Sequence, residues 1–342
     1  MICLRGIVSF ILFLFSFAAM SGAISPRSET ATFCAAGDVL LDRGCRTMIR
    51  RHGYDYLFAR VGDFIRIHDL SLCNLENPLS SRGKAPGKGI TFRADSAFVE
   101  VLKRSGFDIF CMANNHILDC GPRALLDTRG ILESNGLAAV GAGRNTDEAG
   151  APLIVRRRGI TFAFLAYVRV PGFGVPSADD RPRPAIADSA EIREGIARAR
   201  VRADIVIVSF HWGVEYTPRP TAEQVNLAHL SIDSGADLVL GHHPHVIQSI
   251  EKYRGKLILY SLGNFVFDQH VPVQRESLLF CCGFRDGRIV SPHIIPVLLP
   301  LRSFRPVFPS CGETIRIMDR VKAISRGYGI TFRDSDVATY IE

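Results

Sequence analysis

The sequence predicts an α/β fold, a single large domain in which two sheets pack between helices. Short apolar runs alternate with helical patterns through the first half, and this βαβα order favours a largely parallel sheet covered by helices. In the second half, hairpin signals such as Arg285-Asp286-Gly287-Arg288 predict antiparallel strands. The chain has 342 residues, of which 47% are hydrophobic and 22% charged. These values exclude a disordered, collagen-like or multi-pass membrane protein.

The expected elements follow one another regularly along the chain. Gly106 ends the helix that begins at Asp95, and Pro122 lies in the first turn of the next helix. Arg156-Arg157-Arg158, followed by Gly159 between two apolar runs, predicts a solvated hairpin tip. Strands are expected over 31–37, 70–75, 107–113, 137–140, 205–210, 238–240 and 257–260, β-rich stretches over 154–168 and 278–297, and helices over 95–104, 122–134, 221–233 and 314–325.

The N-terminus has the pattern of a secretory signal. Arg5 precedes an apolar run from Ile7 to Met20, which is short for a membrane-spanning helix. Ser21-Gly22-Ala23 then offers a cleavage site between small residues. We therefore expect a signal peptide over 1–23, cleaved near Ala23, and a periplasmic or extracellular mature protein. An uncleaved N-terminal membrane anchor is the alternative.

Charge and cysteine content narrow the expected partners. The net charge of +7 favours anionic partners only weakly, and no Lys/Arg block is long enough for a nucleic-acid arm, so no nucleic acid is expected. Export permits disulfides, yet most of the nine cysteines lie in apolar, strand-like runs, where a thiol behaves as a small hydrophobe. At most one or two bridges are expected, among Cys45, Cys120 and Cys311.

Five predicted strands end in residues that bind metals or move protons. These residues are Asp38, Glu76, Asn115 with His116, His211, and His243 with His245. Ligands of open α/β sheets gather beyond the carboxyl ends of strands, so these distant segments are expected to converge. Carboxylates, imidazoles and an Asn oxygen form a mixed N/O set that suits Mn, Fe, Zn or Co, as one or two divalent ions.

His243-Pro244-His245 is the most specific piece of this pattern. On an extended segment, two imidazoles separated by one residue point the same way, and Pro244 keeps the segment out of a helix. His116, in Asn114-Asn115-His116, can protonate a leaving oxygen as a general acid does. A polar turn with solvated histidines is the competing interpretation.

Six blocks of the sequence together resemble the CapA family of poly-γ-glutamate capsule-synthesis proteins, within the calcineurin-like metallophosphoesterase superfamily. The blocks are Gly37-Asp38, Asn74-Leu75-Glu76-Asn77-Pro78, Asn114-Asn115-His116-x-x-Asp119-x-Gly121, His211-Trp212-Gly213-x-Glu215-Tyr216, Gly241-x-His243-Pro244-His245-Val246-x-Gln248 and Ser261-Leu262-Gly263-Asn264-Phe265. The resemblance implies a four-layer α/β/β/α sandwich over 31–327, with a dinuclear metal site at the strand ends.

The resemblance also implies roles for individual residues. Asp38 would bind the first metal and share in catalysis, and Glu76 would bridge. Asn115 and His211 would bind the second metal, His243 and His245 would complete the sites, and His116 would be the general acid. Glu215 and Tyr216 would line the substrate pocket, and Asn264 would either contact substrate or hold a turn.

Two departures from the superfamily pattern leave the metal count open. The superfamily's Asp-x-His reads Asp38-Val39-Leu40 here, which removes one imidazole ligand, and Leu75-Glu76 replaces its Gly-Asp. A metal-dependent hydrolase of phosphoester or amide bonds, linked to poly-γ-glutamate capsule synthesis or export, is the first functional hypothesis. A non-catalytic component that binds or exports an anionic polymer is the second, and metal-independent acid/base chemistry on a peptide is the third.

The expected partners follow from the same resemblance. They are an anionic polymer or a phosphorylated substrate, with membrane-bound capsule-synthesis machinery as a further partner to consider. Neither the substrate nor the oligomeric state follows from the sequence.

Overall fold

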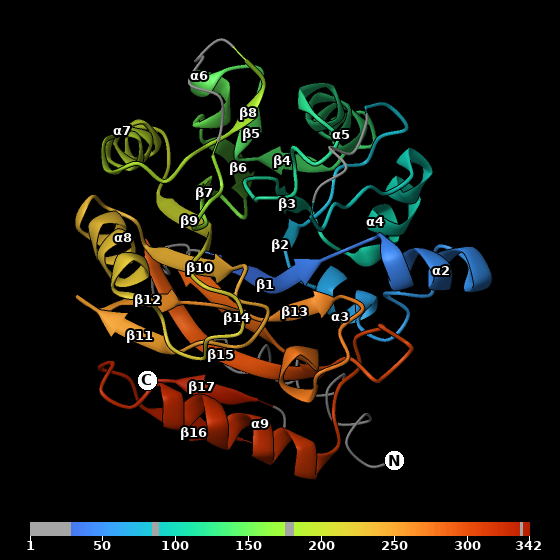
Figure 1. The fold of residues 1–342 in the computed structure, drawn as a ribbon. Coiled ribbons are helices and arrows are strands. Elements are labelled where there is room, and N and C mark those ends of the chain that lie inside the picture. Colours follow the sequence, from blue (N-terminus) through green and yellow to red (C-terminus); the bar gives the residue numbers. More distant parts are fainter. Residues whose placement is uncertain (1–28, 84–88, 175–180, 336–337) are drawn as a thin grey trace, which may run out of the picture.

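Two β-sheets face each other at the centre of the protein, and helices cover both outer faces (Figure 1). The computed structural model describes residues 29–83, 89–174, 181–335 and 338–342, so the expected signal peptide lies outside the described residues. The prediction of two sheets packed between helices is confirmed, in a mixed α/β domain with four layers.

The larger sheet contains nine strands and joins a parallel half to an antiparallel half. Its order is β16-β17-β15-β14-β1-β2-β3-β4, and β13 pairs with β1 in parallel. The strands β1 to β4 are mutually parallel, whereas β14 to β17 run antiparallel to their neighbours. The bounds are β1 (Ala31–Val39), β2 (Leu70–Leu75), β3 (Ile109–Cys111), β4 (Ala138–Val140), β13 (Asn264–Val266), β14 (Glu276–Arg285), β15 (Arg288–Leu298), β16 (Phe332–Asp334) and β17 (Thr339–Ile341).

The smaller sheet contains six strands in the order β11-β12-β10-β9-β7-β6. Its four central strands are parallel, and each edge strand closes an antiparallel hairpin. The bounds are β6 (Leu153–Arg157), β7 (Ile160–Arg169), β9 (Ile205–Trp212), β10 (Leu238–His242), β11 (Ile250–Tyr253) and β12 (Lys256–Leu259); a two-stranded ribbon pairs β5 (Ala142–Gly143) with β8 (Arg183–Pro184).

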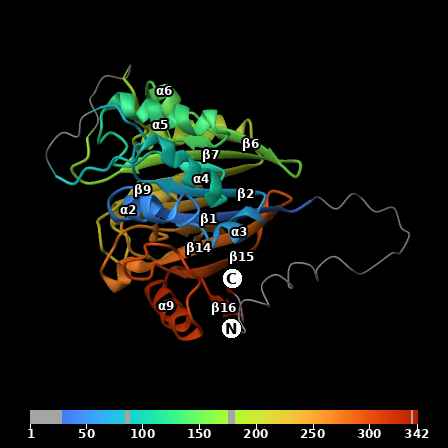
Figure 2. The same cartoon turned by 90° about the vertical axis from the view of Figure 1, so that its right-hand side faces the viewer.

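Helices form the outer layers. Those that follow β1, β2 and β3 cover the larger sheet, while those before and after β9 cover the smaller one (Figures 1 and 2). The first group is α2 (Arg43–His52), α3 (Gly62–Arg66), η2 (Ser96–Phe98), α4 (Val99–Ser105) and α5 (Pro122–Ser134); the second is α7 (Ser189–Arg200) and α8 (Ala222–Asp233); the rest are α6 (Thr146–Ala149), η3 (Pro272–Arg275) and α9 (Cys311–Ile324).

Local sequence signals explain where these elements begin and end. The β14–β15 hairpin turns at Asp286 and Gly287, both with positive φ (51° and 69°), as the Asp-Gly pair predicts. The β6–β7 hairpin likewise turns at Arg158 and Gly159, which confirms the predicted tip. Thr221 caps α8 through a capping box with Gln224.

The last helix is attached to the larger sheet through a buried carboxylate. Glu276, at the start of β14, is fully buried and pairs with Arg316 (2.5 Å) and with Arg320, both on α9. Because a buried carboxylate is stable only when paired, this contact fixes α9 against the sheet. Beyond residue 327, β16 and β17 continue the sheet from β15.

The described cysteines are mostly buried thiols, as expected. Cys45 and Cys120 are among them, so neither takes part in the bridge that the sequence left open. Cys311 lies exposed at the start of α9. Within the described part of the chain, no helix combines the length and the apolarity that crossing a membrane requires.

Candidate metal centre

The space between the two sheets is apolar along most of its length and becomes polar where the parallel strands end. On β2 the row that faces this space reads Leu70, Leu72, then Asn74 and, after the strand, Glu76. Since alternate residues of a strand share a face, the same change occurs on every parallel strand that ends there. The other rows end in Asn115 after β3, His211 on β9 and His242 on β10, each preceded by core residues two positions apart: Ile109, Cys111, Ala113; Ile205, Ile207; Leu238, Leu240.

Asp38 reaches this space through an irregularity in β1. The register between β1 and β2 shifts between Ala35 and Asp38, so the carboxylate points at the strand ends. Gly37 permits the close approach of β13, because a Cβ there would lie 1.8 Å from the Gly263 carbonyl oxygen. The Asp38 Oδ1 accepts from Asn74 Nδ2 (2.9 Å).

Asn74 and His211 link the two sheets at the centre of the group. Asn74 Nδ2 lies 3.3 Å from both Glu76 Oε2 and His211 Nδ1. The other ring nitrogen of His211 lies 2.8 Å from Asn115 Oδ1 and 3.9 Å from Glu76 Oε1. Asp38, Asn74, Glu76 and His211 are all at most 1% exposed.

The segment that carries His243 and His245 is a tight turn and not the extended segment that the sequence predicts. His243 has φ of 93° and His245 φ of 56°, values that non-glycine residues rarely adopt. The backbone amide of His243 donates to Asp38 Oδ2 (3.3 Å), and the two imidazole rings lie 5.9 Å apart. Strained turns of this kind persist only where the surroundings hold them, and they cluster at functional sites.

Asn264 and Tyr216 hold the turn in place. Asn264 Oδ1 lies 2.8 Å from His245 Nδ1, while its Nδ2 donates to the carbonyls of His245 (3.1 Å) and Gln274 (2.8 Å). The Tyr216 amide donates to the Pro244 carbonyl (2.8 Å). Asn264 is fully buried, so its described contacts are those of a positioning residue, whereas Tyr216 and the neighbouring Glu215 are exposed at the mouth.

His116 lies beside this group with its ring oriented by a carboxylate. Its Nδ1 is 2.8 Å from Asp119 Oδ2, and that oxygen also accepts from the Phe92 amide (2.6 Å). The Phe92 ring packs on the imidazole at a centroid distance of 4.2 Å. The ring is therefore fixed, with Nε2 left for a substrate.

Burial and neighbouring charges divide the histidines into neutral and charged ones. Burial lowers the pKa of His211 well below its usual range and that of His243 to about 3, so both imidazoles are neutral at neutral pH. Burial also opposes the charge on His245, but Glu76 and Asp38 outweigh it and raise the pKa of His245 well above its usual value.

The two carboxylates respond to burial differently. Burial disfavours the charge on Asp38, yet hydrogen bonds from His242 and His245 hold its pKa well below the usual range. Burial raises the pKa of Glu76 despite the nearby His245, which lies 3.3 Å from Glu76 Oε1.

Two sets of potential ligands meet here among the described residues. Asp38, Glu76 and His211 each offer one ligand atom, and these atoms lie within 4.8 Å of one another; the same holds for Glu215, His243 and His245. All the metal-ligand, acid and pocket residues expected from the sequence are thus brought to one place.

His242 and Asn74 belong to this place too, and the sequence analysis missed both as site residues. His242 Nδ1 lies 3.4 Å from Asp38 Oδ1, and His242 faces His211 across the β10–β9 pair. Strand periodicity could have identified them, because His242 continues the inward row of Leu238 and Leu240, and Asn74 that of Leu70 and Leu72.

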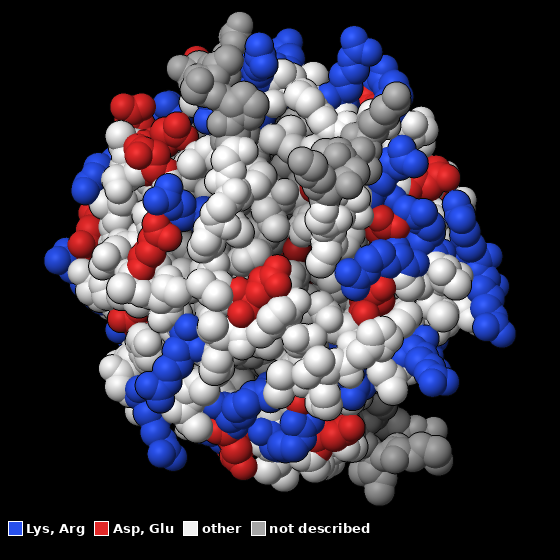
Figure 3. Space-filling model, in the orientation of Figure 1, with Lys and Arg blue, Asp and Glu red and all other residues white. Residues whose placement is uncertain are grey.

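The surroundings of the group open on one face of the molecule. Figure 2 shows β1 leading to α2, so the carboxyl end of β1 faces the viewer in Figure 1. In Figure 3, which has the same orientation, acidic side chains gather near the centre of that face and basic ones lie mostly toward its edge.

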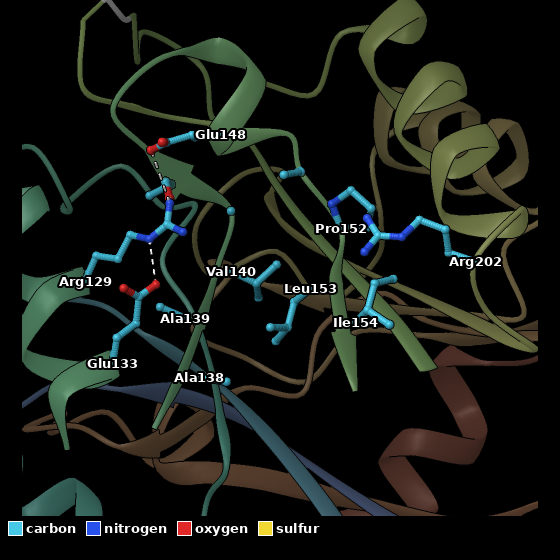
Figure 4. A pocket seen from close by; sticks show the side chains of 13 residues that line it. Arg129, Glu133, Ala138, Ala139, Val140, Glu148, Pro152, Leu153, Ile154 and Arg202 are labelled. Atoms are coloured by element: carbon cyan, nitrogen blue, oxygen red, sulfur yellow. Dashed lines mark hydrogen bonds and ion pairs between the residues drawn. The ribbon is translucent and has the colours of Figure 1, made fainter. Parts of the chain in front are cut away.

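A separate cavity of about 300 Å³ lies where β4 approaches β6 (Figure 4). Arg129 in its wall pairs with Glu133 (2.8 Å) and Glu148 (3.6 Å), and its floor is formed by apolar side chains such as Val140 and Leu153. Its lining includes neither histidine nor cysteine, so this cavity lacks the groups for the chemistry expected of the strand-end site.

Comparison with known proteins assigns the family. The family model described as "Bacterial capsule synthesis protein PGA_cap" matches residues 32–269. The chain belongs to this family. It is 30% identical over 308 residues to the "Capsule biosynthesis protein CapA" of Bacillus anthracis, a match that covers 88% of this chain and 75% of that protein.

Another PGA_cap relative is the "PGA biosynthesis protein CapA" of Bacillus subtilis (strain 168), 37% identical over 246 residues; the match covers 71% of this chain and 65% of that protein, less than two thirds of its length. Among solved structures, a 5'-nucleotidase precursor from Thermus thermophilus gives a TM-score of 0.46 at 12% identity over 86% of this chain and 58% of that one, a similarity too weak to support a conclusion. The PGA_cap family is linked to poly-γ-glutamate capsule biosynthesis, and the resemblance seen in the sequence is thereby confirmed.

Proposed function

We propose that this PGA_cap protein is an exported, metal-dependent hydrolase that cleaves a phosphoester or amide bond during poly-γ-glutamate capsule synthesis or export. The observation that carries the proposal is a set of buried ligand atoms without hydrogen-bond partners among the described residues. They are Glu76 Oε1, both ring nitrogens of His242, and His243 Nδ1. Each such atom costs about 1–3 kcal/mol when left unpaired, so their concentration in one place favours a bound cation.

The donor set fits a divalent transition metal. Asp38, Glu76 and Asn115 would supply oxygens and His211, His243 and His245 would supply nitrogens, with His242 beside them. His211 and His243 are neutral at neutral pH, the form in which imidazole binds a metal. A metal bound there would supply Lewis acidity and a hydroxide nucleophile at neutral pH.

The chain's own groups account for the proton transfer. Asp119 hydrogen-bonds to His116 Nδ1 and stabilises the imidazolium, so Nε2 carries the proton that goes to the leaving oxygen or nitrogen. Tyr216 and Glu215 lie at the mouth, where they would contact the substrate. Asn264 would keep His245 in its position and tautomer.

Electrostatics supports a bound cation for the expected substrates. A γ-glutamyl polymer and a phosphoester are both anionic, yet the site holds two buried carboxylates and has Glu215 at its mouth. An anion would be repelled by these groups unless a cation lay between them and the substrate.

A second candidate, acid/base chemistry without a metal, is favoured by the position of His245. Its ring nitrogens lie 3.5 Å from Asp38 Oδ2 and 3.3 Å from Glu76 Oε1, so an imidazolium could neutralise both carboxylates itself. Activity that survives complete metal removal would favour this candidate.

The deciding experiment combines elemental analysis of the purified protein with assays on generic phosphodiesters and on poly-γ-glutamate. Metal bound at the site, with hydrolysis that chelation abolishes and metal restores, is the expected result. If the protein binds the polymer but hydrolyses no phosphoester or glutamyl substrate with metal supplied, it is a binding or export component instead.

We expect the mature chain to begin near Ile24 and to be found outside the cytoplasm. The reason is the short apolar run that ends in Ser21-Gly22-Ala23. N-terminal sequencing of the exported protein tests this. An intact Met1 on the exported chain would contradict cleavage and favour the membrane anchor.

A further inference from the structure

A second cluster of metal-binding side chains lies on the opposite face of the larger sheet. Cys34 on β1 faces Cys281 on β14, and Cys281 faces His293 on β15. Because directly opposed residues of antiparallel strands point the same way, these three side chains form a row. His68, between α3 and β2, completes the group with a ring nitrogen within 4.8 Å of both sulfurs.

The spacing of the two sulfurs matches that in a tetrahedral metal site. The Sγ atoms of Cys34 and Cys281 are 3.7 Å apart, and both residues are fully buried. Two thiolates bound to one Zn²⁺ at about 2.3 Å in tetrahedral geometry lie about 3.8 Å apart. A disulfide needs about 2.05 Å, so the sulfurs would have to move markedly to form one. Without an ion they make a weak S–H···S contact.

Both imidazoles are oriented as metal ligands are. His68 Nδ1 lies 3.0 Å from the Phe64 carbonyl oxygen, and His293 Nδ1 lies 2.9 Å from that of Ser291. A ring that donates from Nδ1 to a carbonyl carries its lone pair on Nε2. Metal-binding histidines are held in this way by the groups around them. His293 also interacts with Cys281, which it faces.

We propose that Cys34, Cys281, His68 and His293 form a tetrahedral Zn²⁺ site, distinct from the strand-end centre. Two thiolates and two imidazoles make a soft set that selects zinc over the oxygen-preferring ions. All four positions are taken by protein, so the ion is structural. It would join β1, β14, β15 and the segment before β2, and β1 carries Asp38 four residues further along.

Cobalt is the probe, because a thiolate ligand gives Co²⁺ a charge-transfer absorption that N/O ligands do not. The full-length reduced protein should bind Co²⁺ with this absorption, and Zn²⁺ should abolish it. Cys34→Ser and Cys281→Ser should each remove most of it. Cys282→Ser is the matched control, because Cys282 is the adjacent buried cysteine on the other face of β14.

Two further variants keep the test decisive. His293 is only partly buried, so His293→Gln should fold even if a core cysteine variant does not, and it should weaken Co²⁺ binding at least tenfold. His211→Ala, in the strand-end centre, should leave the sulfur absorption intact, so the failure of either site can be told from that of the other. Absence of the absorption in the reduced protein, or its persistence in Cys34→Ser, would overturn the site. A Cys34–Cys281 disulfide that forms even when Zn²⁺ is supplied would also overturn it.

Discussion

His116→Asn should lower turnover by about a hundredfold or more while fold and bound metal stay nearly unchanged. The imidazole is held by Asp119 and packed on Phe92, and the substitution removes the proton that the leaving group needs. Asparagine keeps polarity and the size of the near half of the ring, which limits packing effects. The effect should be largest on substrates with poor leaving groups, because these depend most on the proton.

The measurement is a series of hydrolysis assays in which only the leaving group varies, run beside metal analysis. Asp119→Asn should show the same trend with a smaller loss, because it leaves the imidazole present but less well oriented. His52→Ala, an exposed histidine on α2, is the matched control and should behave as wild type. Full activity of His116→Asn on poor leaving groups would show that another group is the acid.

His211→Ala should lose metal and activity together. His211 is 1% exposed, and its two ring nitrogens lie near Asn74, Asn115 and Glu76. Removing the imidazole takes away a neutral nitrogen ligand and leaves an oxygen-rich set that holds a transition metal poorly. We expect the activity to fall at least as far as in His116→Asn, but through loss of the ion.

Elemental analysis and activity of the same preparation test this prediction. His229→Ala is the control, because His229 lies on α8 and pairs with Glu251 (3.0 Å) outside the site. Thermal unfolding should show that both variants remain folded. Metal content equal to wild type in a folded His211→Ala would contradict its assignment as a ligand. Zinc held by Cys34 and Cys281 would remain in all of these variants, so the loss should be partial in total metal.

Features coded within a few residues were predicted well. The Asp286-Gly287 turn needs only two residues that tolerate positive φ, and the helix that starts after Thr221 needs only its capping box. The convergence of polar strand ends was predictable too, because parallel strands place their carboxyl ends at one edge of a sheet.

Features that depend on distant partners were not predictable. The direction of Asp38 follows from a register shift against β2, and the turn at His243 and His245 is held by Asn264 and by the amide of Tyr216. Nothing in the local sequence His243-Pro244-His245 reveals positive φ, so the extended segment was the wrong inference. The row formed by Cys34, Cys281 and His293 likewise exists only once three strands are in register.

The pairing of β1 with β14 also governs when the protein can fold. The contact between Cys34 and Cys281 spans 247 residues, and β1 lies in the middle of its sheet. Long-range pairing of this kind slows folding, because the loop must close before its contacts form. A nascent chain that ends before β14 leaves one side of β1 unpaired, so hydrogen exchange on such a fragment should find the β1 amides unprotected. A chain that crosses a membrane before it folds would benefit from that delay.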